Sequence, residues 1–406
     1  MILRKLLAFC LTAWLPAWAV AQESAIDSTL LFPVTTDTVT LVWPQNVQAK
    51  LDNLVGQPLL QTSQLGMMVY DLTADSTIYA YNHRQTMRPA SVMKVVTAIT
   101  ALQRLGGNYQ LRTSLSHTGT VEGRTLWGDL VCSGSCDPCF EHSDLVGFAS
   151  SVRQLGIDTI CGTVRAERSE RDTLKWGEGW CWDDKNPTLA SLLVGRKPYF
   201  VEQLRHELER DSVVFVYSPE TTNGQRTTVC QQTHTIDQVL LRMMKESDNL
   251  DAEALFWQLA LTARNTTPRT DEARRCVKQL ISSLGLNVAD YRIADGSGLS
   301  LYNYVSPELL VRLLRYAYQQ PAIRSHLLFC LPIAGTDGTL MKRMTGTPAD
   351  GNVRAKTGTV TGISSLAGYC TAANGHELCF CIINQGVLRG SDGRQFQDSV
   401  CAALCE

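Results

Sequence analysis

Three short motifs occur in the chain in an order that indicates serine acyl transfer. They are Ser91-Val92-Met93-Lys94, Ser247-Asp248-Asn249 and Lys356-Thr357-Gly358-Thr359. A serine hydroxyl is a weak nucleophile at neutral pH, so a neighbouring group must accept its proton as it attacks. Each motif alone is short enough to arise by chance, and the second could simply cap a helix. Their agreement in order and setting favours a single active site.

The first motif has to lie on a helix. Residues three positions apart share a helix face, which brings the Lys94 amine beside the Ser91 hydroxyl. An apolar stripe that begins at Val95 predicts a helix that opens at the serine and ends at Gly106. Burial and a second cation, Lys356, would lower the pKa of the amine. We therefore predict Ser91 as the nucleophile and Lys94 as its general base.

The remaining motif residues suit a peptide substrate. Ser247 can relay a proton toward the leaving amine, and Asn249 offers an amide donor and a carbonyl acceptor to the substrate backbone. The third motif is predicted on a strand, where Gly358 would let a peptide approach closely and add to the sheet edge. Thr357 and Thr359 can then hold the terminal carboxylate of that peptide.

The elements that carry these motifs divide the chain unequally. A length of 406 residues suggests two or three domain-sized units. Two strand-like runs within residues 66–82 predict a hairpin just before the first motif. Residues 111–184 differ in character, and their mixed strand and helix patterns predict a small α+β unit set into the chain. Helical periodicity returns at residues 199–209 and dominates residues 236–261.

The dipeptide Asn374-Gly375 predicts a hairpin near the carboxyl end. With a two-residue loop, Cys370 would face Cys379 at a site where the β-carbons come closest. Two readings are open: a cross-strand disulfide, or two small buried apolar side chains.

The first residues have the pattern of an export signal. Arg4 and Lys5 precede an apolar run over residues 6–20, and Ala19-Val20-Ala21 is a small-x-small cleavage site. Pro16 interrupts the run, which falls short of the ~20 apolar residues that a membrane span needs. We expect cleavage after Ala21 and a periplasmic or secreted protein without a stable membrane span. Cleavage removes two basic residues, so the formal net charge falls from −2 to −4 and a nucleic-acid partner is disfavoured.

Cysteine is abundant for an exported chain. Thirteen of the 14 cysteines follow the expected cleavage site, which predicts disulfides more readily than metal binding. Cys132, Cys136 and Cys139 include one Cys-x-x-Cys, but no second Cys or His pair follows at ligand spacing. The sequence therefore predicts no metal site and no cofactor, and leaves the role of this cluster open.

Beyond the three motifs, several further segments carry a resemblance to a known family. They are Arg88-Pro89-Ala90, Gly128-Asp129-Leu130, Ser135-Cys136-Asp137-Pro138, residues 179–184, residues 295–300 and residues 335–340. The chain resembles the class C low-molecular-mass penicillin-binding proteins, the dacB-type D-alanyl-D-alanine carboxypeptidase/endopeptidases. The two glycine-rich runs, at residues 295 and 335, are expected to be turns rather than catalytic elements.

The resemblance implies a penicillin-recognising fold of the serine transpeptidase and β-lactamase type. This fold has a central five-stranded antiparallel sheet with helices on both faces and an α+β domain inserted after the first motif. The expected boundaries are a signal peptide at 1–21, a catalytic domain at 22–110 and 185–406, and the insert at 111–184. Better-known members carry two inserts, and only residues 95–246 separate the first two motifs, so the second is expected to be absent.

The resemblance also implies an activity. A serine DD-peptidase would cleave D-Ala-D-Ala termini or D-Ala cross-links of peptidoglycan stem peptides, with an oxyanion hole from the backbone amides of Ser91 and Thr359. β-Lactam antibiotics would acylate the same serine. Carboxypeptidase and endopeptidase activity differ only in the leaving group, and the sequence does not separate them.

The sequence disfavours two other functions. A class A β-lactamase needs Glu-x-x-x-Asn to activate the hydrolytic water, and no Glu after Ser91 has Asn four residues on. A catalytically weak penicillin-sensing or wall-binding protein would tolerate loss of a motif residue, and none is lost.

Overall fold

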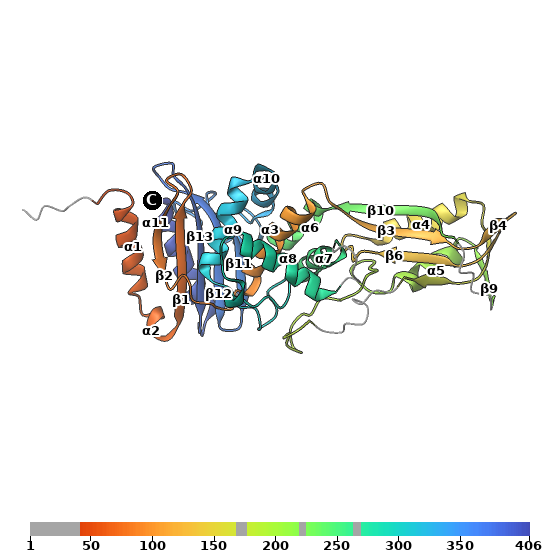
Figure 1. Ribbon diagram of the computed structural model, residues 1–406, viewed down its shortest axis with the longest axis horizontal. Coiled ribbons are helices and arrows are strands. Elements are labelled where there is room, and N and C mark those ends of the chain that lie inside the picture. Colours follow the sequence, from red (N-terminus) through yellow and green to blue (C-terminus); the bar gives the residue numbers. More distant parts are fainter. Residues whose placement is uncertain (1–40, 168–176, 219–224, 263–268) are drawn as a thin grey trace, which may run out of the picture. The chain divides into compact units, whose positions relative to one another are not determined.

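A five-stranded antiparallel sheet forms the centre of the part of the chain that carries the motifs (Figure 1). Its order, β11-β12-β13-β1-β2, places strands from the two ends of the sequence side by side. The strands are β1 (Gln64–Asp71), β2 (Ser76–Tyr81), β11 (Arg354–Val360), β12 (Ile363–Thr371) and β13 (Glu377–Gln385). The five-stranded antiparallel sheet and the hairpin predicted within residues 66–82 are both confirmed.

The structure, a computed structural model, describes residues 41–167, 177–218, 225–262 and 269–406. The expected signal peptide, residues 1–21, lies outside these ranges. Within them, no helix combines the length and the apolar character that crossing a bilayer requires.

Helices cover both faces of the sheet (Figure 1). Successive side chains of a strand point to opposite faces, so two separate cores form. On one face the sheet packs against α1 (Gln45–Val55) and α11 (Gly390–Cys405). The other face packs against a larger helical layer. Its helices are α3 (Met93–Leu105), α6 (Ile236–Lys245), α7 (Asn249–Leu261), α8 (Thr270–Ser283), α9 (Pro307–Gln319) and α10 (Pro321–Cys330). Short helical turns are α2 (Leu59–Thr62), η1 (Ala90–Val92), η3 (Val288–Asp290) and η4 (Gly338–Leu340).

The helix predicted to open at Ser91 is confirmed as α3, although its first residue is Met93. Ser91 lies in the preceding turn, η1, and α3 ends at Leu105, followed by the capping residue Gly106 with a left-handed φ of 83°. Every side chain of α3 from Met93 to Leu102 is buried, because helices pack around it on several sides.

The hairpin of β12 and β13 has a different register from the expected one. Thr371 pairs with Glu377, and the Ala372 amide donates to the His376 carbonyl (2.9 Å), so the loop consists of the three residues 373–375 rather than two. Cys370 therefore faces Leu378, and the predicted pairing with Cys379 is wrong. A shift of one residue reverses the face on which a side chain lies. Cys370 is buried against α11, whereas Cys379 is buried in the core on the opposite face.

The segment between α3 and α6 forms two further four-stranded sheets. Their orders are β10-β3-β6-β8 and β4-β5-β7-β9. A common core joins them to α4 (His142–Gln154) and α5 (Phe200–Arg210). The strands are β3 (Gln110–His117), β4 (Thr120–Glu122), β5 (Thr125–Trp127), β6 (Leu130–Gly134), β7 (Thr159–Cys161), β8 (Val164–Ala166), β9 (Val214–Val216) and β10 (Thr227–Thr235).

The insert boundary expected at Asp184 is too early. Strands β9 and β10 pair with β7 and β3, and α5 contributes Phe200 to the shared core. The first and last strands lie side by side, with Gln110 opposite Thr235. The sequence after Asp184 reads as helical because α5 is amphipathic, but its apolar face is buried within the inserted unit.

Candidate active site

The first two motifs meet at the amine of Lys94. Its Nζ donates hydrogen bonds to Oγ of Ser91 (3.0 Å) and to Oδ1 of Asn249 (2.7 Å). The first contact follows from the i, i+3 spacing across η1 and α3. The second arises because α7 packs against α3 and begins at Asn249. The structure thus brings the predicted nucleophile, base and amide together.

A third partner of Lys94 is a backbone atom. Nζ also donates to the carbonyl oxygen of Ser297 (2.8 Å), which lies in the loop of residues 295–300. This glycine-rich run was expected to be only a turn. It is a turn, but one that contacts the site, since the Thr97 hydroxyl on α3 donates to the Gly296 carbonyl (2.6 Å). The sequence could reveal the glycines but not which carbonyl faces the lysine.

Burial and the nearby acids shift the pKa of Lys94 in opposite directions. The side chain is fully buried, and burial lowers its pKa to about 8 against the attraction of the nearby acids Asp295 and Glu253. Glu253 supports the loop, because its Oε1 accepts hydrogen bonds from the amides of Gly296 (3.0 Å) and Ser297 (2.9 Å). A substantial fraction of Lys94 is therefore neutral near pH 8.

The second motif occupies the turn between α6 and α7. Ser247 has a left-handed φ of 62° and is half-buried. Asp248 caps α7 by accepting from the Asp251 amide (2.9 Å), and Arg196 donates to the Asp248 carboxylate (2.6 Å). The capping and catalytic readings of this motif are thus compatible, because Asp248 fixes the helix start from which Asn249 reaches Lys94.

The third motif lies on β11, an edge strand of the central sheet. Lys356 is fully buried, and its Nζ donates to the Thr357 carbonyl (2.7 Å). Burial, followed by the proximity of Lys94, lowers the pKa of Lys356 well below its usual value. Within the described ranges Lys356 has no carboxylate partner. The Thr357 hydroxyl donates to that of Thr339 (2.8 Å) in η4, and Thr359 is exposed.

The backbone around Ser91 leaves no room for a side chain at position 358. A β-carbon at this position would lie 2.9 Å from the Pro89 carbonyl oxygen and 3.0 Å from the Ser91 amide nitrogen. Gly298 plays a similar part, since its φ is 80° and a β-carbon there would overlap the Ala90 carbonyl. Gly358 was expected to make room for a peptide. The structure shows a further role, because the lack of a β-carbon lets β11 lie close to the turn that carries Ser91.

The three clustered cysteines separate in the structure. Cys132 is buried in the core of the inserted unit, Cys136 is buried in the helical core, and Cys139 lies 3.8 Å from Nη2 of Arg242. Arg242 also donates to the Pro138 carbonyl (2.9 Å), so this stretch attaches the insert to α6. Across the described residues, no three His, Cys, Asp or Glu side chains are grouped to hold a metal ion.

The chain is similar to several known proteins in sequence and in fold. The chain is 24% identical over 411 residues to D-alanyl-D-alanine carboxypeptidase DacB from Haemophilus influenzae, covering 80% of this chain and 86% of that protein. The crystal structure of penicillin binding protein 4 (dacB) from the same organism matches with a TM-score of 0.75 at 22% identity, covering 89% of this chain and 98% of that one. Its complex with a β-lactam matches with a TM-score of 0.71 at 23% identity, covering 87% and 98%.

The structural match confirms the expected fold class, a penicillin-recognising domain with a mixed α/β architecture. A profile of the D-Ala-D-Ala carboxypeptidase 3 (S13) family matches residues 47–193 and 195–405, which is most of the sequence. The chain belongs to the D-Ala-D-Ala carboxypeptidase 3 (S13) family.

Proposed function

We propose that the chain cleaves the peptide bond after D-Ala in peptidoglycan stem peptides through an acyl-enzyme on Ser91, with Lys94 as the general base. Membership of the S13 family makes it a D-Ala-D-Ala carboxypeptidase. The residue roles rest on one observation, the set of three hydrogen-bond partners around Lys94.

As an ammonium, Lys94 can donate to all three partners, and a neutral amine can keep all three if the Ser91 contact reverses its direction. A neutral lysine has two N–H groups and one lone pair. The Asn249 Oδ1 and the Ser297 carbonyl can only accept hydrogen bonds, so they take the two N–H groups. The Ser91 hydroxyl can donate, so the lone pair faces the proton that must leave as the serine attacks.

The reaction then follows in two steps. Ser91 Oγ forms a bond to the D-Ala carbonyl carbon while its proton passes to Lys94, and the backbone amides of Ser91 and Thr359 stabilise the oxyanion. Collapse breaks the C–N bond, and the leaving amine receives a proton from Lys94 through the Ser247 hydroxyl. Water then attacks the ester carbon and gives a proton to Lys94, which returns it to Ser91 Oγ as the ester C–O bond breaks.

Edge strand β11 provides the binding surface for the peptide. A substrate can add beside it as a further strand, with Thr357, Gly358 and Thr359 lining the contact. The Asn249 Oδ1 is occupied by Lys94, which leaves its Nδ2 to meet a substrate carbonyl. Burying a cation without an anionic partner is costly. The terminal carboxylate of the substrate would supply the negative charge that is missing beside Lys356.

β-Lactams would enter the same site, because their strained amide and adjacent carboxylate imitate the D-Ala-D-Ala end. The test is intact-mass measurement after incubation with benzylpenicillin. The unmodified chain should gain the mass of one penicillin, and Ser91→Ala should gain none. A labelled Ser91→Ala protein would remove Ser91 from the mechanism. Product analysis on muropeptides separates the two leaving groups, free D-Ala and a cross-linked stem peptide.

We infer that the inserted unit, residues 110–235, shapes substrate access, since all three motifs lie outside it, and that residues 1–21 direct export. The outer face of sheet β4-β5-β7-β9 exposes Trp127, Val214 and Val216. Replacing all three by Ser should leave acylation by penicillin unchanged while altering cleavage of intact sacculi. A folded variant with impaired acylation would contradict this role.

Amino-terminal sequencing of the exported protein tests cleavage after Ala21.

A further inference from the structure

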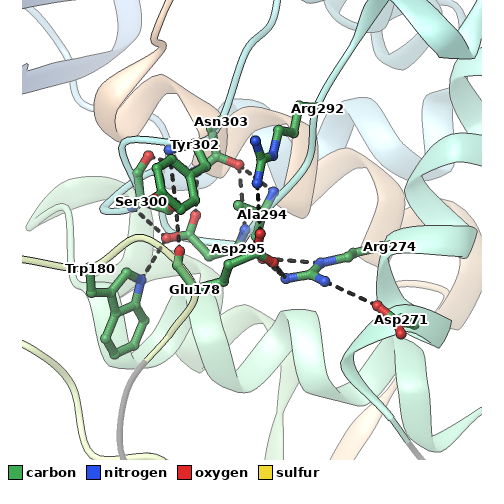
Figure 2. Close-up of polar contacts among 10 residues, drawn as sticks. All are labelled: Glu178, Trp180, Asp271, Arg274, Arg292, Ala294, Asp295, Ser300, Tyr302 and Asn303. Carbon is green, nitrogen blue, oxygen red and sulfur yellow. Dashed lines mark hydrogen bonds and ion pairs between the residues drawn. The ribbon is translucent and has the colours of Figure 1, made fainter.

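Asp295 lies in the loop whose Ser297 carbonyl contacts Lys94. Figure 2 shows Trp180, Ser300 and Asn303 around the Asp295 carboxylate. The residue is 3% exposed, and its two oxygens accept five hydrogen bonds. Three come from the loop itself, two backbone amides and one hydroxyl, and a fourth comes from the Asn303 side chain (2.7 Å). Those loop donors are the amides of Gly298 (2.8 Å) and Ser300 (2.7 Å) and the hydroxyl of Ser297 (3.3 Å).

The fifth donor comes from the segment that follows residue 176, far from the loop in sequence. Nε1 of Trp180 donates to Oδ2 of Asp295 (2.9 Å). The same segment is bound to the loop through its backbone, because the Ser300 hydroxyl donates to the Glu178 carbonyl (2.6 Å). Gly179 has a φ of 76°, and a β-carbon there would lie 2.7 Å from Oγ of Ser300.

Two ion pairs fix this segment in place (Figure 2). The Glu178 carboxylate accepts from Arg292 (2.8 Å) and from Arg274 (2.6 Å), and these bonds lower its pKa. Arg274 also donates to the Ala294 carbonyl (2.7 Å), directly before Asp295. The segment and the loop therefore share the same anchors and should move together.

We propose that Trp180 is a positioning residue for Lys94, acting through Asp295 and the loop whose Ser297 carbonyl holds the amine. This inference rests on the proposed function. It assigns part of the catalytic support to a residue that lies within residues 110–235, outside the three motifs. The indole N–H stabilises the Asp295 carboxylate in the orientation that gathers the loop amides, and the loop in turn fixes the carbonyl. A displacement of this carbonyl would misdirect the lone pair of Lys94 away from Ser91.

The test is Trp180→Phe, which removes the N–H donor and keeps an aromatic ring. Stopped-flow acylation by a chromogenic cephalosporin gives the maximal rate and the half-saturating concentration separately. The maximal rate should fall about tenfold, the scale of losing one hydrogen bond to a buried charge, with half-saturation unchanged. Trp182→Phe is the matched control, because Trp182 lies in the same segment but is 84% exposed, and it should acylate like the unmodified chain.

The final extent of acylation separates positioning from folding. A purely structural role would lower the fraction of Trp180→Phe that becomes acylated, while the folded remainder would react at the normal rate. That outcome would overturn the proposal, as would a normal rate in the whole population. Failure of the unmodified chain to acylate at Ser91 would instead refute the proposed function.

A second variant, Asp295→Asn, tests the route of the effect through pH dependence. The ionisable groups that act on Lys94 are Asp295, Glu253, Asp248 and Asp251, together with Lys356. Removing the negative charge of Asp295 destabilises the ammonium form of Lys94 and lowers its pKa. The midpoint of the acylation profile should therefore fall by about one pH unit. Because Trp180 acts through Asp295, adding Trp180→Phe to Asp295→Asn should cause no further loss of rate. A double variant slowed by the product of the two single effects would refute this route.

Discussion

The Lys94 Nζ lies 2.7 Å from the Asn249 Oδ1, although 155 positions separate the two residues. Asn249 is therefore a hydrogen-bond partner of the proposed general base as well as a candidate contact for the substrate. The amide oxygen fixes one N–H of Lys94, and the Ser297 carbonyl fixes another. The direction of the remaining lone pair is therefore set by two acceptors that are held by separate elements.

Removing the general base should impair acylation far more than it impairs folding. We expect Lys94→Ala to lower the rate of acylation by benzylpenicillin by about a hundredfold to ten-thousandfold. Lys278→Ala, an exposed lysine on α8, is the control and should react normally. Time-resolved intact mass gives both rates. Acylation of Lys94→Ala within a few-fold of the control would exclude Lys94 as the base.

Acylation should depend on pH through Lys94. The neutral amine is the reactive form, and burial lowers its pKa to about 8. The rate constant at low penicillin concentration should therefore rise from pH 6 to pH 8 and level off above, with about 1% of the plateau at pH 6. Circular dichroism at each pH controls for unfolding. A flat profile between pH 6 and pH 9 would show that Lys94 does not titrate in this step.

Converting the Asn249 amide to a carboxylate should move this profile upward. In Asn249→Asp, an anion replaces the Oδ1 that lies 2.7 Å from Nζ, which stabilises the ammonium and raises the pKa of Lys94. We expect the midpoint of the acylation profile to rise by about one pH unit or more. Asn287→Asp, at an exposed position before η3, should leave the midpoint unchanged. An unshifted midpoint in Asn249→Asp would contradict the observed contact.

The close approach of β11 to the nucleophile turn predicts a severe effect at Gly358. Gly358→Ala places a methyl group against the Pro89 carbonyl and the Ser91 amide. The free energy of unfolding should fall by about 1–3 kcal/mol, and acylation should slow because the turn is displaced. Gly147→Ala provides the contrast, since this helical position in α4 is open and the change should raise stability by about 0.5–1 kcal/mol. Urea denaturation measures both, and equal stability of the two variants would refute the predicted crowding.

Much of the fold and site could be predicted from the sequence because the relevant signals are local. Side-chain chemistry and the i, i+3 spacing identified Ser91 and Lys94, and helical and strand periodicities located α3 and β11. The order of the three motifs indicated one site before any distance was known. The resemblance added the five-stranded sheet and the fold class, both of which the structure and its comparisons confirm.

The tertiary structure decided what local patterns do not encode. The Ser297 carbonyl reaches Lys94 across 203 positions, and every residue has a carbonyl, so no residue type marks it. The partnership of Trp180 with Asp295 spans 115 positions and depends on the packing of separate elements. One extra loop residue shifts the register of the β12–β13 hairpin. Cys370 and Cys379 therefore lie on opposite faces of the central sheet. The sequence by itself determined which groups could react, whereas long-range packing determined which acceptors orient them, because those contacts form only when distant segments fold together.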